Sequence, residues 1–152
     1  MIAGKKVNDK VNEYCKLRDR QHAVYANCAK ANGLTVNELF VLDILWFANS
    51  GVTQKEIIER LSANKQTISA VVARFLKDGY ITLVKTDDDR RNKIIRFTEK
   101  GKKYAEKIIP PAADAENLAM ADLNEEEMNE LVRLTIKFTE KMEKRFSAIK
   151  EN

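Results

Sequence analysis

The chain has 152 residues, of which 44% are hydrophobic and 33% are charged, with a net charge of +4. This size and balance suit one compact domain or a small domain with extensions, and the presence of only 5 glycines and 2 prolines favours long helices. The first ten residues carry no apolar run of signal-peptide length, and no stretch approaches the ~20 apolar residues that a membrane span requires. We therefore expect a cytoplasmic protein.

A single histidine and two cysteines limit the chemistry that one chain can assemble. Cys15 and Cys28 fall in one predicted helix, about 20 Å apart along its axis, which is beyond disulfide reach and fits free thiols. These residues cannot build a zinc or thiolate cluster, and the sequence has no phosphate-cradling glycine loop or nucleophile motif. We expect no cofactor, no metal and no enzymatic activity.

Helical periodicity dominates the first third of the chain. Apolar residues predict a long helix over 8–31, which Asn32–Gly33 ends because glycine suits the left-handed position after a helix. A second helix opens at Thr35 and stops near 49–51. Thr35 and Glu38 form a capping box, in which each side chain satisfies a free backbone N–H of the other.

Two shorter helices are expected next. The first covers 53–61, because Thr53 and Glu56 repeat the capping box. The second covers 64–77, where Asn64 is a good N-cap and apolar residues recur at helical spacing. Those apolar residues are Ile68, Val71, Val72, Phe75 and Leu76. A pair of helices of this kind places its second helix in the major groove of DNA.

After Gly79 the period changes from helical to extended. β-Branched and aromatic residues predict strands over 80–85 and 93–97, and the polar segment 86–92 joins them into a hairpin. A basic hairpin tip beside a helix pair can reach the adjacent minor groove, so this order of elements predicts a winged helix-turn-helix.

The remainder of the chain is expected to be helical. Thr98 caps a helix running towards Ile109, which Pro110–Pro111 must break or kink because proline lacks an N–H and clashes with the preceding turn. The apolar pattern resumes over 112–120, and Asn124 opens a last helix with an acidic first turn. Its apolar stripe comprises Met128, Leu131, Leu134, Phe138, Met142, Phe146 and Ile149.

The outward side of the 64–77 helix is the candidate DNA-reading surface. It mixes small residues with hydrogen-bond donors and has no acid before Asp78, which suits approach to base edges better than an ordinary solvated face. Hydroxyls near a helix start commonly hold phosphate, although a local backbone hydrogen bond accounts equally well for Thr67. The candidate contacts are Lys65, Gln66, Thr67, Ser69, Ala70 and Arg74.

Three runs, 64–69, 75–81 and 89–101, resemble the MarR family (multiple-antibiotic-resistance regulators). The Asp-Arg-Arg tip followed by a Phe-Thr-Glu-Lys-Gly helix start is the most specific part, and the resemblance extends over nearly the whole chain. It implies a mainly α fold with a small β-hairpin wing, in a single domain over 1–152. A winged helix-turn-helix lobe would cover 34–101, with helical dimerisation regions over 1–33 and 102–152. It also implies a homodimer that binds a palindromic double-stranded operator.

The hairpin tip carries the second group of candidate DNA contacts. A guanidinium there can enter a narrow, electronegative minor groove, and Asp89 can hold Arg91 by a fork-shaped ion pair. The resemblance assigns the minor-groove role to Arg91, and Arg90 beside it is a further candidate. Asp87 and Asp88 favour a solvated charged turn instead, since they repel phosphate.

The sequence thus predicts a transcriptional regulator, a repressor released by a small aromatic or anionic effector, with activation left open. The resemblance implies an effector between the dimer helices and the DNA-binding lobe, with candidate lining residues Tyr14, Arg18, His22, Tyr25 and Trp46. Two alternatives stay open. Cys15 is a candidate thiol sensor, as in relatives that detect organic hydroperoxides, although a buried structural cysteine fits as well. Ala70 and Leu83 depart from the family pattern by removing potential DNA contacts, which allows a protein-interaction scaffold.

Overall fold

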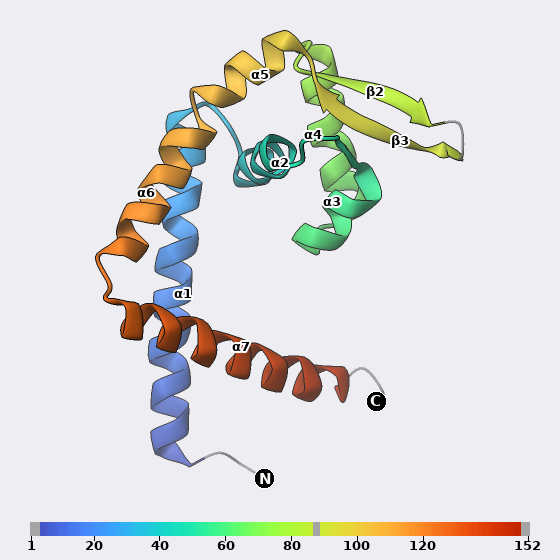
Figure 1. Cartoon of the computed structure of the whole chain (residues 1–152). Helices are drawn as coiled ribbons and strands as arrows, with labels where there is room; N and C mark the ends of the chain where they lie inside the picture. The colour runs from blue at the N-terminus through green and yellow to red at the C-terminus, as the bar shows by residue number, and fades with distance from the viewer. Residues whose placement is uncertain (1–3, 87–88, 150–152) are drawn as a thin grey trace. The chain divides into compact units, whose positions relative to one another are not determined.

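A computed structural model describes residues 4–86 and 89–149, with the side chains of 89–92 outside the description (Figure 1). The chain is mainly helical with one small three-stranded antiparallel sheet, which confirms the fold class expected from the sequence. It separates into two compact units, Met1–Pro110 and Pro111–Asn152. None of the helices within the described ranges combines the length and apolar character that crossing a membrane requires.

The elements follow the predicted order, with one addition. They are α1 (Lys5–Ala31), α2 (Val36–Phe47), β1 (Val52–Thr53), α3 (Gln54–Leu61), α4 (Lys65–Lys77), β2 (Ile81–Thr86), β3 (Asp89–Phe97), α5 (Glu99–Glu106), α6 (Ile109–Ala121) and α7 (Glu125–Ser147). We call α2 to β3 together with α5 the winged lobe.

The helix starts are fixed by the caps that the sequence predicted. The Thr35 hydroxyl accepts from the Glu38 N–H at 3.2 Å, and the Glu38 carboxylate accepts from the Thr35 N–H at 2.9 Å. Thr53 and Glu56 repeat this box at the start of α3. The bond from the Thr53 N–H, and after it the Thr53 hydroxyl, holds the pKa of the Glu56 carboxyl below its usual value. These local bonds place each helix start to within a residue.

One hydrophobic core joins the elements of the winged lobe. Its fully buried large side chains come from α2, α3, α4, β3 and the start of α6, and they are Val41, Leu42, Ile57, Ile68, Phe75, Ile95 and Ile109. Buried residues of β1, β2 and α5 complete this core. Helix α4 is therefore held in the lobe by apolar packing along one of its faces.

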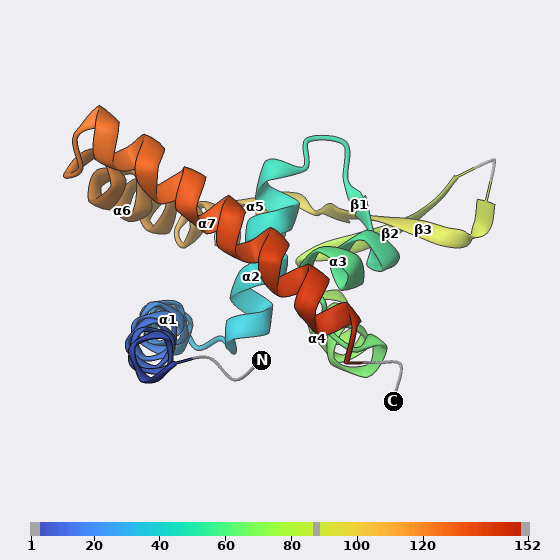
Figure 2. The same cartoon turned by 90° about the horizontal axis from the view of Figure 1, so that it is seen from below.

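The sheet has the strand order β1-β3-β2, with β1 and β2 flanking β3 (Figure 2). The sequence did not predict β1, whose two residues pair with Ile95 and Ile94. It was also wrong about the ends of the hairpin. The segment 86–92 was expected as a polar link, whereas β2 extends to Thr86 and β3 begins at Asp89. Antiparallel pairing uses backbone groups, so polar side chains do not stop it.

The predicted break at Pro110–Pro111 lies elsewhere. α5 ends at Glu106, and the N–H groups of Lys107 and Ile108 bond to carbonyls three residues back, which tightens the last turn. The two prolines lie in the first turn of α6, where a missing N–H removes no helical hydrogen bond. They therefore begin a helix instead of ending one.

α5 meets the end of α4 at a close backbone approach. The Thr98 N–H donates to the Tyr80 carbonyl at 3.0 Å, and the Thr98 hydroxyl donates to the Gly79 carbonyl at 2.6 Å. The Tyr104 ring stacks on the Tyr80 ring with centroids 4.2 Å apart, and burial raises the pKa of Tyr104. A Cβ atom at Gly101 would lie 1.8 Å from the Tyr80 carbonyl oxygen. Only glycine fits there.

The second unit is helical, and α7 buries none of its residues. Large apolar side chains on α7 remain exposed, including Leu131 at 46%, Leu134 at 48% and Phe146 at 60%. The apolar stripe that the sequence predicted is present but has no cover within the described unit.

Replacing Gly101 with alanine is expected to destabilise the protein by about 3 kcal/mol or more, because the new methyl group collides with backbone rather than with a movable side chain. Gly33→Ala is the matched control. Gly33 has a positive φ of +69° but open space around its Cβ position, so only backbone strain of about 1 kcal/mol is expected. Urea unfolding at one protein concentration measures both, and equal losses would contradict the steric account.

Candidate nucleic-acid interface

α3 and α4 form a tight helix pair. Ser62 turns the chain in the left-handed region, with φ of 47°, and the Ala63 N–H donates to the Ile58 carbonyl at 3.2 Å. Asn64 then caps α4 by accepting from the Thr67 N–H at 2.7 Å. Helix α4 thus begins within three residues of the end of α3, as a helix-turn-helix requires.

Helix α4 has one buried face and one exposed face. Ile68, Val71, Val72 and Phe75 are buried as predicted, but Leu76 is 38% exposed. The prediction for Leu76 was wrong because eight residues of helix place it about 80° round from Ile68, at the margin of the buried stripe.

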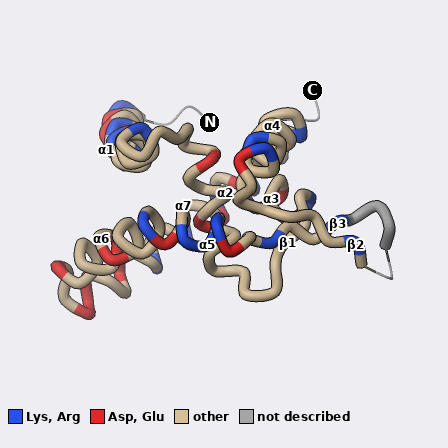
Figure 3. The backbone as a smooth tube through the Cα atoms, turned by 90° about the horizontal axis from the view of Figure 1, so that it is seen from above, with Lys and Arg blue, Asp and Glu red and all other residues tan. Residues whose placement is uncertain are grey.

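The exposed face of α4 keeps the predicted mixture of small residues and donors. Lys65, Gln66, Ala70 and Ala73 are all exposed, and Lys77 continues the face to the end of the helix. The first turn of α4 contains no acid, so nothing there opposes an anion at its positive end. Figure 3 shows where the cations and acids lie along the chain.

Ser69 and Thr67 are only partly accessible. The Ser69 hydroxyl oxygen accepts from the Gln54 side-chain amide at 2.7 Å, which joins the first residue of α3 to α4. A hydroxyl can still donate its own proton when its oxygen accepts a bond. Gln54 was not among the residues predicted from the sequence, because residues 15 apart share no local pattern.

Arg74 has a role that the sequence did not suggest. Its guanidinium is paired with the buried Glu38 carboxylate, and a second nitrogen donates to the Gly33 carbonyl at 3.3 Å. Its Nε lies 3.7 Å from the carboxylate of Asp78. Direct contact of Arg74 with DNA stays a prediction, and the structure adds an internal function for the same side chain.

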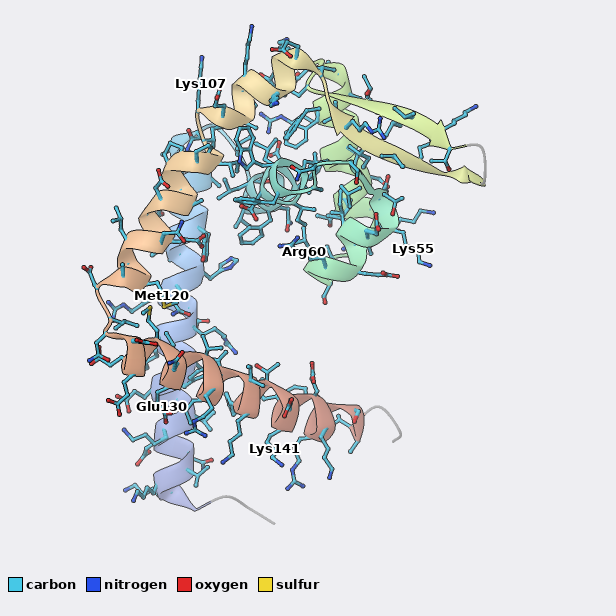
Figure 4. All side chains as sticks on the ribbon, viewed as in Figure 1. Lys55, Arg60, Lys107, Met120, Glu130 and Lys141 are labelled. Carbon is cyan, nitrogen blue, oxygen red and sulfur yellow. The ribbon has the colours of Figure 1, made fainter. Side chains whose placement is uncertain are left out.

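The hairpin carries a pair of cations that the sequence did not single out. Lys85 and Lys93 are directly opposite each other in the register of β2 and β3, and both are exposed. Like charges in opposed positions destabilise a sheet slightly unless an anion lies between them. The side chains of Asp89, Arg90 and Arg91, including the predicted ion pair, lie outside the described residues. Further cations, such as Lys55 and Arg60, project from α3 (Figure 4).

The five candidate effector residues do not line one cavity. Tyr14, Arg18 and His22 are exposed along α1, whereas the Tyr25 ring meets Phe40 edge-on at 5.5 Å. Trp46 lines a separate depression between α2, β3 and α5, together with Phe47, Arg96, Phe97 and Lys102. The first four residues recur along one side of α1, so they stay a candidate group of their own.

The geometry does not test the thiol hypothesis. Cys15 and Cys28 are free and partly buried, so the redox role of Cys15 stays a prediction. Across residues 4–86 and 89–149, no cluster of three or more His, Cys, Asp or Glu side chains is placed to hold a metal ion.

Comparison with known proteins identifies the lobe. A MarR family model matches residues 32–92, which run from the α1–α2 corner into the hairpin. A MarR family regulator from Neisseria meningitidis superposes with a TM-score of 0.71 at 26% identity, over 97% of this chain and 99% of that one. Residues 32–92 thus match the MarR family, and the chain has the fold of a MarR family regulator. The relatives and solved structures that it resembles are transcriptional regulators.

Two further relatives define how far the likeness extends. An HTH-type transcriptional regulator from Bacillus cereus is 32% identical over 95 residues, which cover 62% of this chain and 63% of the relative. The matches span between 53% and 63% of the first curated relatives. MepR from S. aureus, solved in a complex with DNA, shares the fold with a TM-score of 0.71 at 19% identity, over 88% of this chain and 97% of that one.

Proposed function

We propose that this chain is a homodimeric repressor that binds a palindromic double-stranded operator and is released by a small-molecule effector. The observation that carries the proposal is the exposed face of α4, which is free of acid from Lys65 to Lys77 and is presented by a helix pair. Lys65 and Gln66 near the helix start would meet base edges and phosphates in the major groove.

The wing would contact the adjacent minor groove. The opposed pair of Lys85 and Lys93 supports this, because phosphate between them would turn a mutual repulsion into two attractions. Arg91 remains the proposed minor-groove contact, from the strand β3 that bears Lys93. The DNA complex of MepR, a protein of the same fold, adds support by analogy.

Arg91→Ala is expected to lose about 1–3 kcal/mol of DNA affinity while the fold is unchanged, because a desolvated contact in the minor groove is removed. Fluorescence anisotropy with a fragment selected by the purified protein measures the loss at matched salt. Lys107→Ala is the control, since it removes one cation from an exposed site at the end of α5. Equal affinities of the two variants would remove the wing from the mechanism. Binding by neither variant nor wild type at low salt would favour the scaffold alternative.

A second copy of the chain would cover the stripe on α7. Leu131, Leu134 and Phe146 lie along one side of this helix and are between 46% and 60% exposed, and Ile149, just after its end, is 65% exposed. Helix α1 carries further exposed apolar residues, among them Val7, Val11 and Leu17. Exposed apolar stripes of this extent mark interaction surfaces. In a symmetric dimer, the same residues of the second copy would bury the stripes of α1 and α7.

Leu134→Glu is expected to convert the dimer to a monomer at micromolar concentration, because it puts a charge into an apolar interface. Sedimentation equilibrium measures the mass. Asn129→Glu introduces the same charge about 140° away on the helix, outside the stripe, and should leave the dimer intact. A wild-type protein that sediments as a monomer would refute the proposed assembly.

Release by an effector is the third part of the proposal. Aromatic side chains and one cation recur on α1 at Tyr14, Arg18, His22 and Tyr25, which suits an aromatic or anionic compound. The coupling between effector and DNA is reciprocal. If bound effector lowers the affinity of the dimer for DNA by some factor, bound DNA must lower the affinity of the dimer for the effector by the same factor.

Arg18→Gln is expected to weaken binding of aromatic carboxylates, with benzoate as the first probe, because it removes the cation of the proposed site. The single tryptophan, Trp46, lies apart from Arg18, so its fluorescence reports a change that the bound ligand transmits to the winged lobe. DNA affinity of the wild type should fall on addition of the acid, and that of Arg18→Gln should fall less. Aromatic acids that leave both the fluorescence and the DNA affinity of the wild type unchanged would eliminate this class of effector.

A further inference from the structure

Glu38 is a charged side chain in an unusual position. It is 3% exposed, and it is the one buried polar or charged residue among the described parts of the chain. One carboxylate oxygen accepts from the Thr35 N–H, and the other pairs with Arg74. A buried carboxylate without a partner is strongly destabilising, so Glu38 needs Arg74.

Arg74 in turn connects separate parts of the winged lobe. Its side chain starts from α4, pairs with Glu38 in the first turn of α2, and donates to the carbonyl of Gly33, which ends α1. Asn32–Thr35 is the short link between α1 and α2. One guanidinium thus joins the proposed recognition helix to the corner between α1 and α2.

We propose that Glu38 and Arg74 are positioning residues, which fix α4 against the α1–α2 corner so that DNA affinity depends on the pair without contact between Arg74 and DNA. This proposal rests on the proposed function and adds its regulation. A shift of α1 moves the Gly33 carbonyl and the Thr35 cap, and both are bonded to the pair that holds α4. The pair is therefore the path by which a change at α1 reaches the DNA-binding face.

The alternative is the one that the sequence suggested, in which Arg74 contacts phosphate directly. The two accounts differ over Glu38. If Arg74 binds phosphate, Glu38→Gln removes a competing negative charge and leaves DNA binding unchanged or tighter. If the pair positions α4, the same change weakens binding. Glutamine at position 38 can still complete the capping box, so this variant keeps the start of α2.

The experiment compares Glu38→Gln, Arg74→Gln and the double variant with wild type, by DNA titration at several salt concentrations. We expect each single variant to bind roughly tenfold more weakly, within the usual range of coupling between sites. The double variant should be no weaker than the weaker single variant, because both remove one interaction. The slope of log affinity against log salt should stay unchanged, since no phosphate contact is lost.

Lys107→Gln is the matched control, since it removes one exposed cation outside the proposed DNA-binding surface and so measures the effect of net charge alone. The proposal is overturned if Glu38→Gln binds as well as wild type. It is also overturned if Arg74→Gln lowers the salt slope by about one unit, the mark of a lost phosphate contact.

Hydrogen exchange of the protein without DNA separates this proposal from the proposed function. Glu38→Gln and Arg74→Gln should both raise the exchange of amides in α4 and at residues 33–35, and leave those of α7 unchanged. Unchanged exchange overturns the positioning role whether or not the chain binds DNA. If the variants show raised exchange but the wild-type protein binds no DNA, the link between the pair and α4 is supported. In that case only the DNA-binding proposal is refuted.

Discussion

The geometry of the winged lobe depends on one buried carboxylate. Glu38 lies in the first turn of α2, where it completes the capping box with Thr35, and that same position is inside the core. The hydrophobic effect that brings α2, α3 and α4 together has no direction of its own, whereas a hydrogen bond constrains both distance and angle. The bond from Arg74 to Glu38 and the bond from Gln54 to Ser69 are directional, and both end on α4.

Local signals explain what the sequence could predict. Both capping boxes span three residues, and the structure contains both. The pair of Glu38 and Arg74 spans 36 residues, and no periodicity links them. The strand β1 is two residues long, too short to show alternation. Pro110 misled the prediction because proline disrupts the interior of a helix yet suits its first turn, and the sequence does not tell these positions apart.

Helices α4 and α7 show that an apolar stripe in the sequence predicts a helix but does not predict what buries the stripe. Both have apolar residues at three- and four-residue steps. In α4 the stripe is covered by the lobe, and its four central residues are at most 6% exposed. In α7 no residue is buried, although the stripe is longer. The pattern indicates that one face of the helix is apolar and favours burial. Whether the same chain or a second chain buries that face depends on tertiary or quaternary structure. This difference is why the proposed dimer rests on α7.

The composition of the α4 face also bears on how specifically the proposed regulator would recognise its operator. Ala70 and Ala73 offer no hydrogen bond, and the Ser69 oxygen is already engaged by Gln54. Direct reading of bases would then fall mainly to Lys65 and Gln66 at the start of the helix. Lys85 and Lys93 of the wing would bind the DNA backbone, which is the same in every sequence. A regulator of this kind gains much of its discrimination from the shape of the DNA and from the spacing of two half-sites. The angle of α4 therefore matters more than any single contact on it.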